Sequence, residues 1–158
     1  MFSKREQQAI EEKISQLKKF KEGILSSQEL AGLITQRRVR WIKERLEEML
    51  VRYKCLNPEE QAHRIIFFDH MKINPEHSKM IRVSPNKIRI ESYNFCPYLE
   101  ACKELDLETR FICKDIGEPS IQEMASIIHP SLKFSRNYEN IMPYNSLHCE
   151  EYIEIIEV

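Results

Sequence analysis

The spacing of apolar residues differs between the first part of this chain and the segments that follow it, and that difference sets the fold class. Up to about residue 71 the apolar positions recur every three or four residues, as in Ile10, Ile14 and Leu17, which is typical of amphipathic helices. Beyond residue 79 apolar and polar residues alternate in short runs, as they do in strands with one buried face. The order predicts an α+β fold, in which an N-terminal helical hairpin is followed by a small antiparallel sheet with packed helices.

Two helices are expected at the N-terminus, separated by Gly23 and a pair of serines. Ser26 and Glu29 have the spacing of a capping box, so the second helix should begin near residue 28. The first helix has only a narrow apolar stripe, which leaves it available to a partner. We therefore expect residues 1–56 to form a helical hairpin that is a candidate dimerisation element. Residues 57–158 are expected to form an α+β domain that holds most of the cysteines.

Later helices and strands have clear boundary signals. The residues 84–87 read as a turn between strands at 80–83 and 88–91. Pro97 is placed to begin a helix, and His129-Pro130 is placed to end another. A last strand is expected after Cys149.

Composition narrows the function classes. The formal net charge is −1 and 42% of the residues are hydrophobic, so nucleic-acid binding is not expected. The basic stretch 37–43 is followed by glutamates and is interpreted as a solvated helix face. No apolar run approaches the about 20 residues of a membrane helix, and no membrane partner is expected. Five cysteines without extracellular spacing favour reduced thiols and a cytoplasmic location.

The cysteines supply the candidate chemistry, because four of the five lie after residue 93. Cys96 immediately precedes Pro97, so the positive end of a helix should lower its thiol pKa and make it a nucleophile. His129 and His148 are the candidate proton carriers. Alternatively, Cys96, Cys113 and Cys149 form a tetrahedral set with His148 or His129, which makes zinc a candidate cofactor.

Three further residues are candidates for binding a small-molecule substrate. Arg136 and Arg110 are suited to hold a carboxylate through paired hydrogen bonds. Tyr98 is suited to the rim of an amphipathic pocket.

Several groups of residues follow one another in a familiar order: Cys96-Pro97, then Thr109 with Cys113, then the run 129–136, and finally Cys149. This order resembles the L-2-amino-thiazoline-4-carboxylic acid hydrolase-like family, which is related to 4-vinyl-reductase-type ligand-binding domains. The likeness covers residues 88 to 156 and gives no role to the helical N-terminal half. It implies a cytosolic α+β domain whose cysteines line a site, and cleavage of a C–N bond in a small sulfur heterocycle.

Two functions remain open from the sequence. The first is a module that binds a small ligand or a metal through its cysteines and forms a homodimer through its N-terminal helices. The second is a thiol-dependent hydrolase with Cys96 as the nucleophile. The sequence leaves open whether the protein is an enzyme.

Overall fold

The structure, a computed structural model, describes residues 1–142 and 148–156. The chain begins with helices, in the order α1 (Lys4–Lys21), α2 (Ser27–Arg52), α3 (Pro58–Ala62), the π-helix η1 (His63–His70) and the 3₁₀ turn η2 (Pro75–His77). The remaining elements are β1 (Ser78–Ser84), β2 (Lys87–Ser92), α4 (Pro97–Leu105), α5 (Thr109–Ile112), the π-helix η3 (Cys113–Gly117), α6 (Glu118–Ile128), β3 (Leu132–Asn137) and β4 (Cys149–Ile155). The predicted α+β fold, with its N-terminal helices, is confirmed.

Local signals in the sequence explain where several helices begin and end. Ser26 Oγ accepts the backbone N–H of Glu29 at 3.0 Å, and Glu29 Oε1 accepts that of Ser26 at 3.1 Å, so the expected capping box starts α2. Pro97 is the first residue of α4, as predicted. α6 ends at Ile128, immediately before His129-Pro130.

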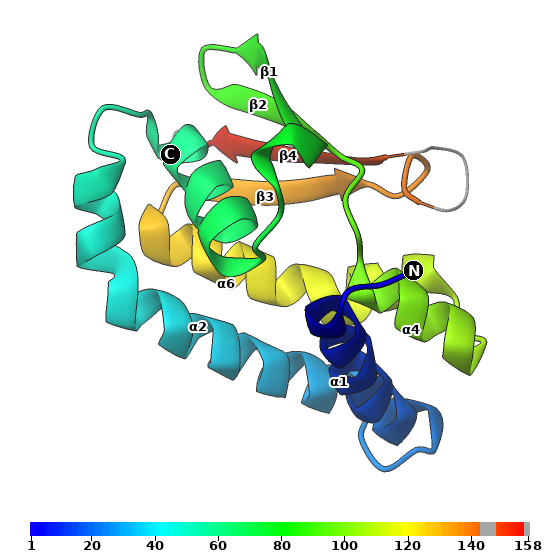
Figure 1. The fold of residues 1–158 in the computed structure, drawn as a ribbon. Helices are drawn as coiled ribbons and strands as arrows, with labels where there is room; N and C mark the ends of the chain where they lie inside the picture. Colours follow the sequence, from blue (N-terminus) through cyan, green and yellow to red (C-terminus); the bar gives the residue numbers. More distant parts are fainter. Residues whose placement is uncertain (143–147, 157–158) are drawn as a thin grey trace.

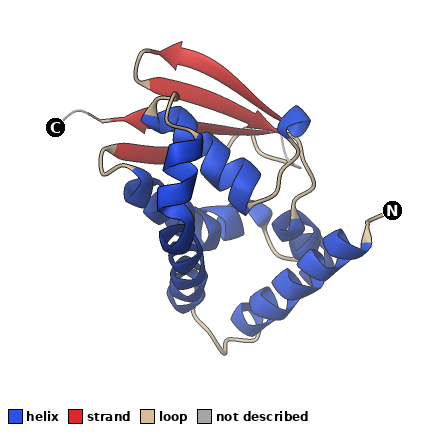
Figure 2. Cartoon of the chain, turned by 60° about the vertical axis from the view of Figure 1, so that its left-hand side comes forward, coloured by secondary structure: helices blue, strands red, loops and turns tan. Residues whose placement is uncertain are grey.

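The strands form one antiparallel sheet in the order β1-β2-β4-β3. Helices cover one of its faces and leave the other without a helix (Figures 1 and 2). On the covered face, Ile88, Ile153 and Phe134 lie beside one another across three strands and are buried. The alternation of apolar and polar residues read from the sequence therefore fixes which face the helices cover.

α6 lies between the sheet and α2, so the helices form two layers under β3 (Figure 1). Ile42 and Met49 of α2 share the main core with Ile66 of η1 and with residues of the sheet. A second apolar cluster joins Leu17 of α1 to α4, through residues such as Ala101. Both clusters thus include residues of the N-terminal helices. The boundary between a helical hairpin and an α+β domain at residue 56 remains a prediction.

An ion pair that includes the buried Glu59 attaches β1 to α3, and its loss should be costly. Arg82 Nη1 lies 2.6 Å from Glu59 Oε1, and Arg82 Nη2 lies 2.7 Å from Glu60 Oε1. Glu59 is 1% exposed, and its Oε2 has no hydrogen-bond partner in the part of the chain that the structure describes. We expect Arg82→Met to lower the free energy of unfolding in urea by about 2–3 kcal/mol, because it leaves the Glu59 carboxylate buried and unpaired.

The matched control for this variant is Arg37→Met. Arg37 pairs with Glu12 at the exposed surface, where an ion pair contributes at most about 1 kcal/mol. If both variants lost the same free energy of unfolding, the burial of Glu59 would have no effect on stability and the account would be contradicted.

Candidate functional site

A cavity of about 260 Å³ lies beneath the covered face of the sheet. Its wall is mainly apolar, with Phe67, Ile73, Ile121 and Ile141 among the contributing residues. The polar and sulfur-containing residues of the lining are Lys13, Arg38, His70, Met71, Ser92, Asn94, Cys96, Tyr98, Cys113, Arg136, Met142, Cys149 and Glu151. Residues from the N-terminal helices and from the sheet therefore meet at one site.

The secondary structure explains why polar side chains reach this cavity. Ser92 lies opposite Cys149, and Arg136 lies opposite Glu151, at one end of the sheet's covered face. The other end of that face carries isoleucines in the same alternation. The two π-helices also contribute to the lining, η1 through His70 and η3 through Cys113. Such segments are frequent at functional sites.

An ion pair forms part of the cavity wall. Arg136 Nη2 and Nε lie 2.8 and 3.3 Å from Glu151 Oε2, and Glu151 is 4% exposed. The guanidinium also lies over the ring of Phe134 at 5.3 Å. Burial opposes the charge of Arg136, but neighbouring Glu151 holds its pKa well above the usual value. Arg136 therefore stays charged inside the fold.

The thiols at the cavity are not activated. Burial raises the pKa of Cys149 to about 12, and it also raises the pKa values of Cys96 and Cys113. At Cys96 the backbone N–H of Leu99 opposes this effect without overcoming it. The expectation that the helix start lowers the Cys96 pKa is wrong. Desolvation destabilises the thiolate by more than the start of the helix stabilises it.

The thiols should therefore differ in reactivity. Cys55 is exposed, whereas Cys102 is buried and its pKa is raised to about 11 by that burial. With an aromatic disulfide reagent at pH 8, we expect Cys55 to react first and the other thiols about tenfold more slowly or less, since the thiolate is the reacting form. Cys55→Ser should remove the fast phase. A fast phase that persists in Cys55→Ser and disappears in Cys96→Ser would contradict this account of burial.

The structure brings together only part of the predicted site. Cys96, Arg136 and Tyr98 line the cavity, whereas His129, His148 and Arg110 are not among its lining residues. His129 Nδ1 instead accepts the backbone N–H of Ser131 at 3.1 Å. Arg110 Nε donates to the carbonyl of Tyr138 at 2.7 Å.

The predicted zinc set is not formed in the described part of the chain. Within residues 1–142 and 148–156 there is no group of three or more His, Cys, Asp or Glu placed to hold a metal ion. Cys96, Cys113 and Cys149 lie at one cavity, but His148 does not complete them as a set of ligands.

The sequence matches no protein-family model and has no significant match among curated proteins. The structure, however, is similar to a solved one, trafficking protein particle complex subunit 3 from Naegleria fowleri covalently bound to palmitic acid. The two have a TM-score of 0.58 and 10% sequence identity, over 97% of this chain and 96% of that one. This chain has the fold of that trafficking-particle subunit.

The trafficking-particle fold corrects the resemblance drawn from the sequence. The structural match includes the N-terminal helices, which the hydrolase-like resemblance left without a role. That resemblance is wrong, and so are the functions drawn from it, both the thiol-dependent hydrolase and the hydrolase-like module for a small ligand or zinc. Its motifs Cys96-Pro97 and His129-Pro130 mark the start of one helix and the end of another, which many folds require.

Sequence reasoning missed several cavity residues of this fold, among them Lys13, Arg38 and His70. Lys13 Nζ donates to Tyr98 OH at 3.3 Å, and Arg38 Nη1 donates to Ser120 Oγ at 3.0 Å. His70 packs edge-on against Trp41 with ring centroids 4.6 Å apart. The sequence contained one signal for Lys13, because this residue lies on the face of α1 that also carries the apolar stripe.

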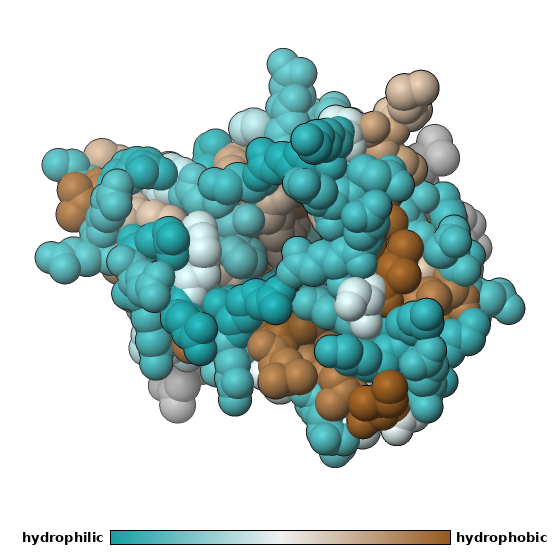
Figure 3. All heavy atoms as spheres, turned by 60° about the horizontal axis from the view of Figure 1, so that its bottom comes forward, coloured by the Kyte–Doolittle hydropathy of each residue, from teal (hydrophilic) through white to brown (hydrophobic). Residues whose placement is uncertain are grey.

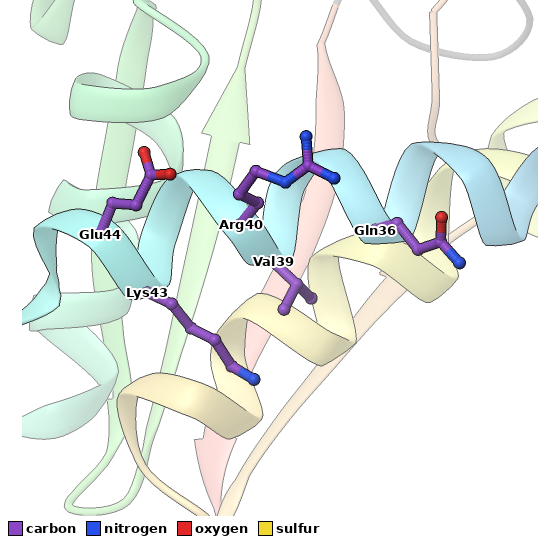
Figure 4. A pocket seen from close by; sticks show the side chains of 5 residues that line it. All are labelled: Gln36, Val39, Arg40, Lys43 and Glu44. Carbon is purple, nitrogen blue, oxygen red and sulfur yellow. The ribbon is translucent and has the colours of Figure 1, made fainter.

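Arg37, Arg40 and Lys43 of the basic stretch of α2 lie at the surface, whereas Arg38 reaches the cavity. Figure 4 shows Arg40 and Glu44 extending to one side of α2, while Val39 and Lys43 extend to the other. Gln36 completes this shallow depression. The helical side of the molecule is mainly hydrophilic, with a few separate apolar groups (Figure 3). None of the described helices has the length and apolar character needed to cross a bilayer.

Proposed function

We propose that this chain is a subunit of a multi-protein assembly with a role in trafficking. The observation that carries the proposal is the match in fold to a trafficking-particle subunit over nearly the full length of both chains. A cytoplasmic location, as the sequence predicts, suits such a role. The partners of an assembly subunit are other proteins, which also suits a chain with little net charge.

We place one protein contact on the N-terminal helices. Ile24 in the turn after α1 and Leu33 on α2 are 65% and 52% exposed. Beside them a groove is lined by Leu25, Leu30 and Leu33 together with the cations Lys19 and Arg40. The simplest occupant is a second copy of the chain, in keeping with the narrow apolar stripe of the first helix.

Sedimentation of the purified chain tests this contact. We expect a dimer that Leu33→Glu converts to monomers, because a charge would be buried in the interface. Val51→Glu is the matched control, since Val51 is 64% exposed on the same helix but lies outside the groove. A wild-type chain that sediments at 18.9 kDa would contradict the homodimer.

The cavity favours a second function for the same subunit, namely that it holds an acyl chain. The similar trafficking subunit is bound to palmitic acid. Here the apolar wall contributed by Phe67, Ile73, Ile121 and Ile141 provides a water-poor environment for a hydrocarbon chain. The acyl proposal differs from the earlier one of a polar heterocycle, because the cavity wall is mainly apolar.

Filling the cavity tests the acyl proposal. A Cβ added at Gly117 has no closer neighbour than the Ile112 carbonyl at 3.9 Å, so Gly117→Met can extend into the cavity. We expect native mass spectrometry of the wild-type protein to detect one added acyl mass, which Gly117→Met lacks. Gly32→Met is the control, since Gly32 is an exposed helical glycine with open space around it. An acyl mass retained by Gly117→Met would contradict the location, and its absence from the wild type would contradict the proposal.

A further inference from the structure

The cavity has more positive than negative charge. Among the described residues, its lining includes the cations Lys13, Arg38 and Arg136 but only one carboxylate, that of Glu151, which pairs with Arg136. The contacts of the other two cations are neutral, since Lys13 donates to Gln16 and Tyr98, and Arg38 to Ser120.

Among the described residues, neither Lys13 nor Arg38 has a carboxylate oxygen within 4.0 Å. Two partly buried charges without a counter-charge favour an anion between them.

A third group in the same region lacks a partner. His70 Nδ1 is buried and has no hydrogen-bond partner within the described residues, although His70 lines the cavity. Burial, and then the nearby charges of Arg38 and Lys13, lower the pKa of His70 to about 3. The imidazole is therefore neutral at physiological pH, and one of its nitrogens is a donor. The effect of Arg38 and Lys13 on this pKa places both cations close to His70 at the cavity.

We propose that Lys13 and Arg38, beside His70, form a head-group subsite that binds the carboxylate of a single-chain amphiphile, whose hydrocarbon chain occupies the apolar part of the cavity. This inference rests on the acyl cavity proposed above, and it specifies the ligand as a free, long-chain carboxylate. The cavity volume of about 260 Å³ is below the range usual for drug-sized ligands, which favours one chain over a two-chain phospholipid.

The proposed ligand is a free carboxylate, whereas palmitic acid is bound covalently in the similar trafficking subunit.

Trp41 provides the readout for the test. It is the single tryptophan of the chain, and its ring lies against His70. Fluorescence titrations would compare dodecanoate with dodecan-1-ol, which has the same chain length but no charge. We expect dodecanoate to bind at least about tenfold more tightly than dodecan-1-ol. The free energy contributed by a hydrogen bond to a charged group corresponds to an affinity difference of at least about that size. Lys13→Met and Arg38→Met should each weaken dodecanoate binding about tenfold and leave dodecan-1-ol binding unchanged.

The controls are Lys18→Met and Lys43→Met, each of which removes one positive charge from an exposed position on α1 or α2. Both should keep the wild-type affinity for dodecanoate. Equal binding of dodecanoate and dodecan-1-ol by the wild type would overturn the head-group subsite and leave the acyl cavity standing. Binding of neither compound would overturn both. Because the comparison of ligands uses the wild-type protein, it does not depend on the folding of any variant.

Discussion

Arg136→Met is expected to lower the free energy of unfolding by about 3–5 kcal/mol. Arg136 is the ion-pair partner of Glu151, whose side chain is 4% exposed. Without the guanidinium, the Glu151 carboxylate would remain in the cavity wall with no positive charge beside it. A buried charge that loses its partner costs more than the intact pair contributes, because its desolvation is no longer offset.

Denaturant unfolding of three variants measures this cost. The double variant Arg136→Met/Glu151→Met should recover most of the loss, since an apolar pair needs no solvation. Lys133→Met is the control, because Lys133 lies on the same strand and is exposed. A double variant that is no more stable than Arg136→Met would contradict the account, because the loss would then come from side-chain packing rather than from the unpaired charge.

Stability is also expected to fall as the pH is lowered from 6.5 toward 4. Burial, followed by the charge of Arg64, lowers the pKa of His63 to about 4, while burial and nearby cations lower that of His70 to about 3. In this window the unfolded chain binds a proton at each histidine and the folded chain does not. Stability therefore rises with pH, at up to about 1.4 kcal/mol per pH unit for each histidine.

Urea unfolding at several values between pH 5 and 6.5 measures this slope above the range in which most carboxylates titrate. His70→Leu should reduce the slope by about half, because only His63 would still contribute. His77→Gln is the control, since His77 is exposed, and it should keep the wild-type slope. A slope unchanged in His70→Leu would contradict the burial of a neutral imidazole at this cavity.

The features of the fold that were predicted correctly are those determined locally. The capping pair Ser26 and Glu29, the proline at the start of α4 and the strand alternation around Ile88 each act within a few residues. Such signals need no knowledge of the tertiary structure. They therefore yielded the α+β fold and the boundaries of several elements.

The cavity could not be predicted in the same way, because it depends on contacts between distant segments. Lys13 and Tyr98 are hydrogen-bonded across 85 positions of sequence, and Arg38 and Ser120 across 82. The pKa of Cys96 shows the same limit of local reasoning. Its position before a helix is visible in the sequence, but the burial that outweighs the helix end exists only in the folded chain.

Native mass spectrometry of the tagged protein, purified gently from its own cells, tests the central claim most directly. As a subunit of a trafficking-type assembly, the chain should be found in a particle of defined stoichiometry that contains other protein subunits. Collisional activation should then release this chain intact from the particle. If the chain is instead recovered only as a free 18.9 kDa protein under the same gentle conditions, the proposed role as an assembly subunit is contradicted.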